Sequence, residues 1–167
     1  MIAVAERTFG LLALLAIVVA LATIVALVRR RVPDWLRDDV ALPLAAAIAA
    51  TATGGSLLLS EVAGYLPCTL CWYQRIAMYP LVVILAVAAV RGDGDVWRTV
   101  LPLTGIGSAI AVWHIAIENN PAWGGPCEDA APCTIIWVEE FGFLTLPTMA
   151  LVAFVTISVL SLAARRP

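Results

Sequence analysis

Apolar residues occur along this chain in long runs rather than in alternation with polar ones. Five such runs stand out, each 18 to 21 residues long. At about 1.5 Å of rise per residue, a helix of that length crosses the hydrocarbon layer of a bilayer. Strands of a membrane barrel would be about ten residues long and would alternate in polarity. The pattern therefore predicts transmembrane helices at Phe9–Val28, Val40–Ser60, Trp72–Val90, Val100–Ile117 and Phe143–Ala163.

Composition supports this interpretation. Hydrophobic residues make up 62% of the chain and charged residues 13%, and the mean hydropathy is +0.97. A soluble domain carries roughly 25% charged and 45–50% apolar residues. We therefore expect an all-α integral membrane protein. The net charge of -2 gives no reason to expect nucleic-acid binding, so we expect none.

Prolines and glycines indicate where the predicted helices begin or end and where they can pack closely. Pro43 and Pro102 are expected in first turns, where a missing N–H costs little. The Asn-Asn-Pro run that begins at residue 119 predicts the end of the fourth helix. The glycines expected to allow close helix contacts are Gly54, Gly55, Gly105 and Gly107.

Arginine placement predicts the orientation. The loops 29–39 and 91–98 and the C-terminus hold eight of the ten Arg residues. Because basic loops stay in the cytoplasm, these regions should be cytoplasmic. The first run has a long core followed by its positive cluster, which is typical of a membrane anchor and not of a secretory signal. We therefore expect an N-terminus outside, a cytoplasmic C-terminus, and a loop 118–142 outside.

All four cysteines fall on the predicted outer side, as the close pairs Cys68/Cys71 and Cys127/Cys133. An even number of cysteines in an oxidising compartment indicates disulfides. A disulfide between cysteines close in sequence stabilises a fold only weakly, because closing a short loop removes little entropy from the unfolded chain. The pattern therefore favours a redox function based on dithiol–disulfide exchange.

Two further residues extend this candidate site. Cys68 begins the third helix, whose N-terminus would favour a thiolate on Cys68 or its partner. Cys71 and Arg75 follow on the same helix face. The sequence has no dinucleotide-binding or c-type haem motif, so a lipid-soluble quinone would suit an acceptor at this depth. His114, the only histidine, is a candidate to bind a quinone carbonyl or relay a proton.

Other interpretations of these residues remain open. The four thiolates would also suit one zinc site, or two structural disulfides in a non-catalytic membrane metal-binding or scaffold protein. We expect no metal, because the pairs lie outside the cell. Arg75 would also suit an interfacial anchor, and His114 an interhelical hydrogen bond. Most of the Trp and Tyr residues suit an aromatic belt.

Three segments together resemble one known family. PCTLCWYQRIAMYPL, VWHIA and EEFGFLTLPTMALVAF are similar to the DsbB/BdbC family of disulfide bond formation proteins, which are membrane thiol:quinone oxidoreductases. The resemblance covers roughly residues 40–163. It implies a four-helix bundle formed by the second to fifth runs, within a redox unit at 40–167 that carries the outer loop 118–142. Residues 1–39 would then be an extra N-terminal transmembrane helix with a cytoplasmic Arg-rich loop.

The resemblance also implies roles for the site residues. Cys127–Cys133 would take electrons from a DsbA-like thioredoxin-fold oxidase on the outer side, with Cys127 forming the mixed disulfide. The electrons would pass to Cys68–Cys71 by thiol–disulfide exchange. Cys68 would exchange with the loop, and Cys71 would face a quinone of the ubiquinone or menaquinone type. Arg75 and His114 would help to bind that quinone.

Three features refine the resemblance. Only five residues separate Cys127 from Cys133, which is more similar to the short-loop, BdbC-like branch than to the long-loop members. The vitamin K epoxide reductase family is a rival in chemistry, but its members place the loop pair before the Cys-x-x-Cys. The first helix lies outside the family pattern.

Overall fold

The structure is a computed structural model that describes residues 2–123, 127 and 131–165. Five of the helices in this part of the chain are long and apolar enough to cross a membrane, as predicted. Parts of the predicted loop 118–142, at 124–126 and 128–130, lie outside the described residues. The five helices are α1 (Ile2–Val28), α2 (Ala41–Leu57), α3 (Thr69–Arg91), α4 (Trp97–Asn119) and α5 (Leu146–Ala163).

Short elements join or extend these helices. α2 is preceded by the π-helix η1 (Leu36–Val40) and continues into the π-helix η2 (Leu58–Val62). A 3₁₀ turn, η3 (Pro121–Trp123), follows α4. The antiparallel strands β1 (Glu139–Glu140) and β2 (Leu144–Thr145) form a small hairpin, with Glu139 opposite Thr145. None of these elements was predicted from the sequence.

Several predicted helix boundaries were wrong. α1 begins at Ile2, before the predicted Phe9. α5 begins at Leu146, because the apolar residues just before it belong to the hairpin. Pro43 is in the first turn of α2, as expected, but Pro102 is the sixth residue of α4. α4 starts early because its first turn is polar, and the periodicity of apolar residues does not mark such a turn. Its end at Asn119 agrees with the prediction.

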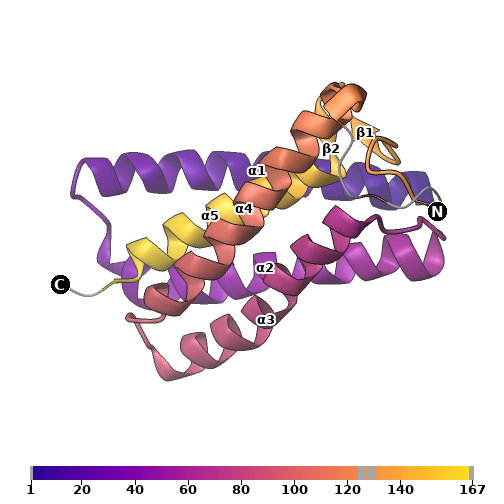
Figure 1. The fold of residues 1–167 in the computed structure, drawn as a ribbon. Coiled ribbons are helices and arrows are strands. Elements are labelled where there is room, and N and C mark those ends of the chain that lie inside the picture. The colour runs from indigo at the N-terminus through magenta and orange to yellow at the C-terminus, as the bar shows by residue number, and fades with distance from the viewer. Residues whose placement is uncertain (1, 124–126, 128–130, 166–167) are drawn as a thin grey trace.

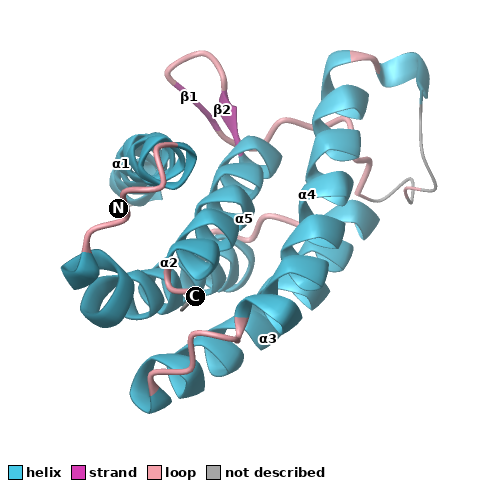
Figure 2. Cartoon of the chain, turned by 90° about the vertical axis from the view of Figure 1, so that its left-hand side faces the viewer, coloured by secondary structure: helices cyan, strands magenta, loops and turns pink. Residues whose placement is uncertain are grey.

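Helices α2, α3, α4 and α5 form a closed ring in which each packs on the next and α5 packs back on α2. α1 lies outside the ring, against α5 (Figures 1 and 2). The largest fully buried side chains between the ring helices include Leu81 and Leu85 of α3 and Phe154 and Ile157 of α5. The predicted four-helix bundle with one extra N-terminal helix is therefore confirmed. The division of the chain into two units near residue 39 stays a prediction.

Two of the four predicted glycine contacts occur. A Cβ on Gly107 of α4 would collide with the ring of Phe154 of α5. A Cβ on Gly55 of α2 would lie 2.9 Å from Cε1 of Phe9 on α1. Gly54 and Gly105 have nothing within 4 Å of such a Cβ. Helical neighbours one or two residues apart point in different directions, so only one glycine of each pair meets an adjacent helix.

Gly107→Ala is expected to destabilise the bundle, because the added methyl group would displace the fully buried Phe154 ring. Overpacking of this kind costs about 1–3 kcal/mol. Gly105→Ala is the matched control in the same helix, where open space and the higher helix propensity of Ala predict a neutral or higher melting temperature. Thermal unfolding of both variants in detergent measures the difference. Equal melting temperatures would contradict the packing described here.

The two ends of the bundle differ in what they carry. Figure 1 places the start of α1 and the β1–β2 hairpin at one end, and the C-terminus at the other. The α1–α2 and α3–α4 connections lie at the end of the C-terminus. The start of α3, which carries the Cys-x-x-Cys, and the end of α4 lie at the hairpin end. The predicted grouping of connections on two sides therefore agrees with the structure.

Candidate active site

Cys68 and Cys71 lie at the N-terminus of α3. Cys68 is the N-cap residue, with an extended backbone, and its Sγ accepts a hydrogen bond of 3.3 Å from the backbone N–H of Cys71. The spacing of three residues brings the Sγ atoms of the two cysteines to 2.9 Å from each other. Cys68 is buried and Cys71 is partly exposed. The two sulfur atoms are therefore close enough to form and break a disulfide with each other.

The environment of Cys68 favours its thiolate. The hydrogen bond with the Cys71 thiol is the largest influence, and it lowers the pKa of Cys68. Burial acts in the opposite direction, while His114 and the backbone N–H of Cys71 lower the pKa further. The net effect lowers the pKa of Cys68 from 9.0 to about 4. A thiolate is the nucleophile in disulfide exchange, so this environment favours Cys68 as the nucleophile of the Cys68/Cys71 pair, called here the inner pair.

This pKa gives a pH prediction. With the inner pair reduced, Cys68 should remain a thiolate above about pH 4 and become protonated as the pH falls through that value. The thiolate absorbance near 240 nm should therefore show one acidic step, which Cys68→Ser should remove. A single step above pH 8 would contradict the assignment of the thiolate.

The loop pair, Cys127 and Cys133, lies next to the inner pair. Cys127 and Cys133 form a disulfide. Cys133 is only 2% exposed and packs in one cluster with Cys68, whereas Cys127 is partly exposed. The Sγ atoms of Cys68 and Cys133 and a ring nitrogen of His114 all lie within 4.8 Å of one another. The structure thus brings all four cysteines into one site, with Cys133 and Cys68 facing each other.

His114 of α4 lies between the two pairs. Its Nε2 is 3.2 Å from the carbonyl oxygen of Cys133 and 3.8 Å from Sγ of Cys68. The amide nitrogen of Gln74 is 3.1 Å from Nδ1. A carbonyl only accepts, so Nε2 carries the proton and Nδ1 accepts from Gln74. The interhelical hydrogen bond considered from the sequence therefore exists, and it holds the ring against the sulfur atoms.

Gln74 was not singled out from the sequence. It is 8% exposed, on α3, between the redox pair and Arg75. The available signal was a polar amide within an apolar helix, one turn beyond Cys71 and thus on its face. A buried amide needs hydrogen-bond partners, and His114 is the partner found here.

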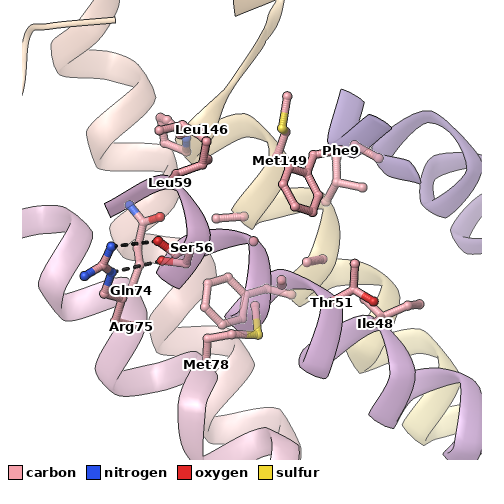
Figure 3. Close-up of a pocket in the computed structure, with 18 of the residues that line it drawn as sticks. Phe9, Ile48, Thr51, Ser56, Leu59, Gln74, Arg75, Met78, Leu146 and Met149 are labelled. Atoms are coloured by element: carbon pink, nitrogen blue, oxygen red, sulfur yellow. Dashed lines mark hydrogen bonds between the residues drawn. The ribbon is translucent and has the colours of Figure 1, made fainter. Parts of the chain in front are cut away.

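Arg75 extends toward α2. Its Nε donates to Oγ of Ser56 at 2.9 Å and its Nη2 to the backbone carbonyl of Ser56 at 3.1 Å (Figure 3). The guanidinium also lies over the ring of Trp72, 5.2 Å from its centre. Among the described residues, no carboxylate forms an ion pair with Arg75. Within the described part of the chain, this cation beside the redox pair therefore has no acidic partner.

A cavity of about 390 Å³ lies beside these groups. Cys71, Gln74, Arg75 and His114 line it together with apolar residues of α1, α2 and α5, whereas Cys68 does not line it. Figure 3 shows Gln74 and Arg75 on the opposite side of the pocket from Phe9. A pocket with a few polar groups in a mostly apolar lining suits a molecule with a polar head and an apolar remainder.

A metal site is the remaining alternative at this position. The ligand atoms of Cys68, His114 and Cys133 are close enough to share an ion. Cys133 is bonded to Cys127 in the structure, so its sulfur is not a thiolate ligand. A zinc site of four thiolates would require this bond to be reduced first.

Comparisons with known proteins identify relatives of this chain. Residues 38–164 match the family model described as Disulfide bond formation protein DsbB. Disulfide bond formation protein C of Bacillus subtilis is 45% identical over 112 residues, which cover 66% of this chain and 81% of that protein. A probable disulfide formation protein of Oceanobacillus iheyensis is 46% identical over 114 residues, covering 66% of this chain and 79% of that protein.

Similarity extends to a relative outside these genera. A probable disulfide formation protein of Metapseudomonas resinovorans is 43% identical over 122 residues, covering 71% of this chain and 85% of that protein. No solved structure matches the chain. The five candidate spans, the paired cysteines and these similarities lead to one conclusion. The chain belongs to the DsbB family and is a multi-pass membrane oxidoreductase that forms disulfides.

Proposed function

We propose that this protein is a thiol:quinone oxidoreductase that reoxidises a DsbA-like thioredoxin-fold oxidase outside the cytoplasm. The observation that carries the proposal is the juxtaposition of two cysteine pairs beside an apolar pocket. Cys133 and Cys68 face each other, and Cys71 lines the pocket. Electrons that enter at the loop pair thus have a continuous route to the pocket.

Electrons enter at Cys127. It is the more exposed member of the loop disulfide, so a thiolate of the partner reaches it before the buried Cys133. Attack forms a mixed disulfide between the partner and Cys127 and releases Cys133 as a thiolate. The second thiol of the partner then attacks the mixed disulfide. The partner leaves with its own disulfide, and the loop pair holds two electrons as a dithiol.

The second exchange joins the two pairs. The Cys133 thiolate attacks Cys68 in the oxidised Cys68–Cys71 pair, and Cys71 leaves as a thiolate. Cys127 then attacks Cys133 and restores the loop disulfide, which leaves Cys68 and Cys71 reduced. His114 Nε2–H, 3.8 Å from Cys68 Sγ, donates toward that sulfur and stabilises its thiolate when Cys68 is the leaving group.

The pocket suits a quinone. A bound quinone supplies an acceptor for the two electrons and two protons that Cys68 and Cys71 release on forming their disulfide. Cys71 lines the pocket, and Arg75 offers a cation that no carboxylate of the described residues pairs with. The apolar remainder excludes water and holds apolar groups. Ubiquinone and menaquinone types both meet this description.

The arginine distribution supports the orientation of the bundle. The cytoplasmic face would carry the Arg-rich end, and the hairpin end with the four cysteines would face the outside. The partner, the loop pair and the inner pair would then share the oxidising side. The pocket extends from that side into the hydrocarbon layer, where a lipid-soluble acceptor dissolves.

The test is quinone reduction by the purified protein in detergent, with a reduced thioredoxin-fold oxidase as the electron donor. Ubiquinone and menaquinone analogues are tried in parallel. We expect continuous turnover that depends on both donor and quinone. Failure with every donor and quinone would remove the proposal, and zinc release by a chelator would then favour the metal site.

Arg75→Ala should weaken quinone binding. Losing a hydrogen bond to a charged group costs about 1.5–3 kcal/mol, so KM for quinone should rise roughly 10- to 100-fold. Arg98→Ala is the matched control, because Arg98 also lies over a neighbouring ring, that of Trp97, but at the other end of the bundle. Unchanged KM for quinone in Arg75→Ala would contradict the role given to this cation.

A further inference from the structure

Helix α1 lies outside the family match, which begins at residue 38, yet it forms part of the pocket. Its lining residues span Phe9 to Val19, about 15 Å along the helix axis. They contribute only apolar side chains, on the side opposite Gln74 and Arg75 (Figure 3). The α1 residues that line the pocket are Phe9, Leu12, Ala13, Leu15, Ala16 and Val19.

Contacts with three other elements fix α1 in this position. The Gly10 backbone lies against the hairpin, where an added Cβ would be 3.1 Å from Cβ of Glu140. The hydroxyl oxygen of Thr156 on α5 lies 3.3 Å from the carbonyl oxygen of Ala16. Near the N-terminus of α1, the Tyr65 hydroxyl donates to the carboxylate of Glu6. α1 is therefore a fixed wall of the pocket.

Exposed lining residues on both α1 and α2 indicate an opening of the pocket between these two helices. Leu12 and Leu15 of α1 line it and are also exposed on the surface of the protein. Ala47 and Thr51 of α2 line it and are exposed as well. On the α5 side, the lining residues are partly or fully buried. Because these exposed positions lie within candidate membrane spans, the opening faces lipid.

We propose that α1 binds the isoprenoid tail of the quinone and thereby sets the preference of the enzyme for long-tailed quinones. This inference rests on the proposed function. The head group would lie at Cys71 and Arg75, and the tail would leave along the apolar face of α1 to the opening between α1 and α2. Contact with α1 removes apolar tail surface from lipid and fixes its direction.

A lipid acyl chain is the competing occupant of this apolar groove. It would satisfy the apolar lining equally well, but it carries no group that accepts electrons from Cys71. The pocket is continuous from the Cys71 side chain to α1, so one molecule with both a head and a tail fills it. The isoprenoid quinone has that shape, and the experiment separates it from an acyl chain.

Two substitutions that fill the pocket from α1, Ala16→Leu and Leu15→Trp, test the inference. Leu11→Trp and Leu21→Trp are the matched controls. They bracket Leu15 on the same helix, are 56% and 58% exposed against 59% for Leu15, and do not line the pocket. The measured quantity is kcat/KM for a long-tailed quinone divided by kcat/KM for its tail-less analogue. We expect this ratio to fall at least about fivefold in both filling variants and to stay constant in both controls.

A binding readout that does not depend on turnover accompanies the kinetics. The full-length protein is irradiated with a long-tailed quinone that carries a photoreactive diazirine in its tail, and the labelled peptides are mapped by mass spectrometry. Label on residues 9–19, lost on competition with the unlabelled long-tailed quinone, is the expected result. Label that only a phospholipid competes away would assign the groove to an acyl chain and overturn the inference.

The outcomes separate the two proposals. If no quinone is reduced by the wild-type protein, the proposed function fails. If quinones are reduced but the filling variants keep the wild-type ratio and no label reaches α1, the function stands and the role of α1 is wrong. If one of the two filling variants does not fold in detergent, the other one is used for the kinetic test. The labelling experiment uses the wild-type protein and requires no variant.

Discussion

Cys71→Ser is expected to abolish quinone reduction, with a loss of at least about 10³-fold, as for other residues that act as one catalytic unit. The serine hydroxyl cannot form a disulfide with Cys68, so the inner pair can no longer release two electrons. Cys127 and Cys133 are both present in this variant, so it still holds one disulfide equivalent. It should still oxidise one equivalent of the reduced partner and then stop. Quinone reduction and partner oxidation, each measured in a single turnover, test both expectations.

The same variant tests the contact between the two pairs. The Cys68 thiolate, next to Cys133, should attack the loop disulfide and accumulate a Cys68–Cys133 bond with Cys127 free. Peptide mapping after alkylation detects that bond. Tyr73→Phe is a control on the same turn of α3, because Tyr73 is exposed and does not line the pocket. Substantial quinone turnover by Cys71→Ser would contradict the assignment of Cys71 as the sulfur that faces the acceptor.

The double substitution Cys127→Ser/Cys133→Ser should give the complementary result. Steady-state turnover with the protein partner should fall at least about 10³-fold, because the partner loses the exposed disulfide that it attacks. The inner pair is unchanged in this variant. When it is reduced chemically beforehand and the reductant is removed, the protein should reduce one equivalent of quinone and stop.

This double variant distinguishes a relay from a direct reaction. Steady-state turnover near the wild-type rate would mean that the partner reaches Cys68 directly and that the loop pair is structural. No quinone reduction even by the pre-reduced variant would mean that the loop disulfide is needed to keep the inner pair in place. The proposed route predicts a single turnover and rules out both of these results.

The fold could be predicted largely because bilayer thickness determines the length of apolar runs. The five runs located the five helices within a few residues. Errors occurred where polar residues continue a helix, as at the starts of α1 and α4, and where apolar residues belong to another element. Leu144, counted as part of the last helix, is fully buried in β2, where it pairs with Glu140 of β1.

The candidate site could be predicted in its members but not in its contacts. The close spacing of each cysteine pair and the helix face shared by Cys71 and Arg75 follow from local geometry. The meeting of Cys133 with Cys68 depends on how the loop folds back over α3, and no local pattern reports that. Gln74 and the α1 wall were missed for the same reason, because their roles depend on neighbours distant in sequence.

The burial of Cys133 and Cys68, which are 2% and 4% exposed, also affects how well the enzyme resists side reactions. Small thiols in the surrounding medium collide with every accessible sulfur, and a thiol that reduced the inner pair directly would drain the quinone pool without making useful disulfides. In the proposed relay, the sulfurs of Cys133 and Cys68 come second and third and are buried. The more accessible sulfurs, those of Cys127 and Cys71, are the first and the last. In the proposed route, reducing equivalents would therefore enter where the partner docks and leave where the membrane acceptor binds, with little loss to other thiols in between.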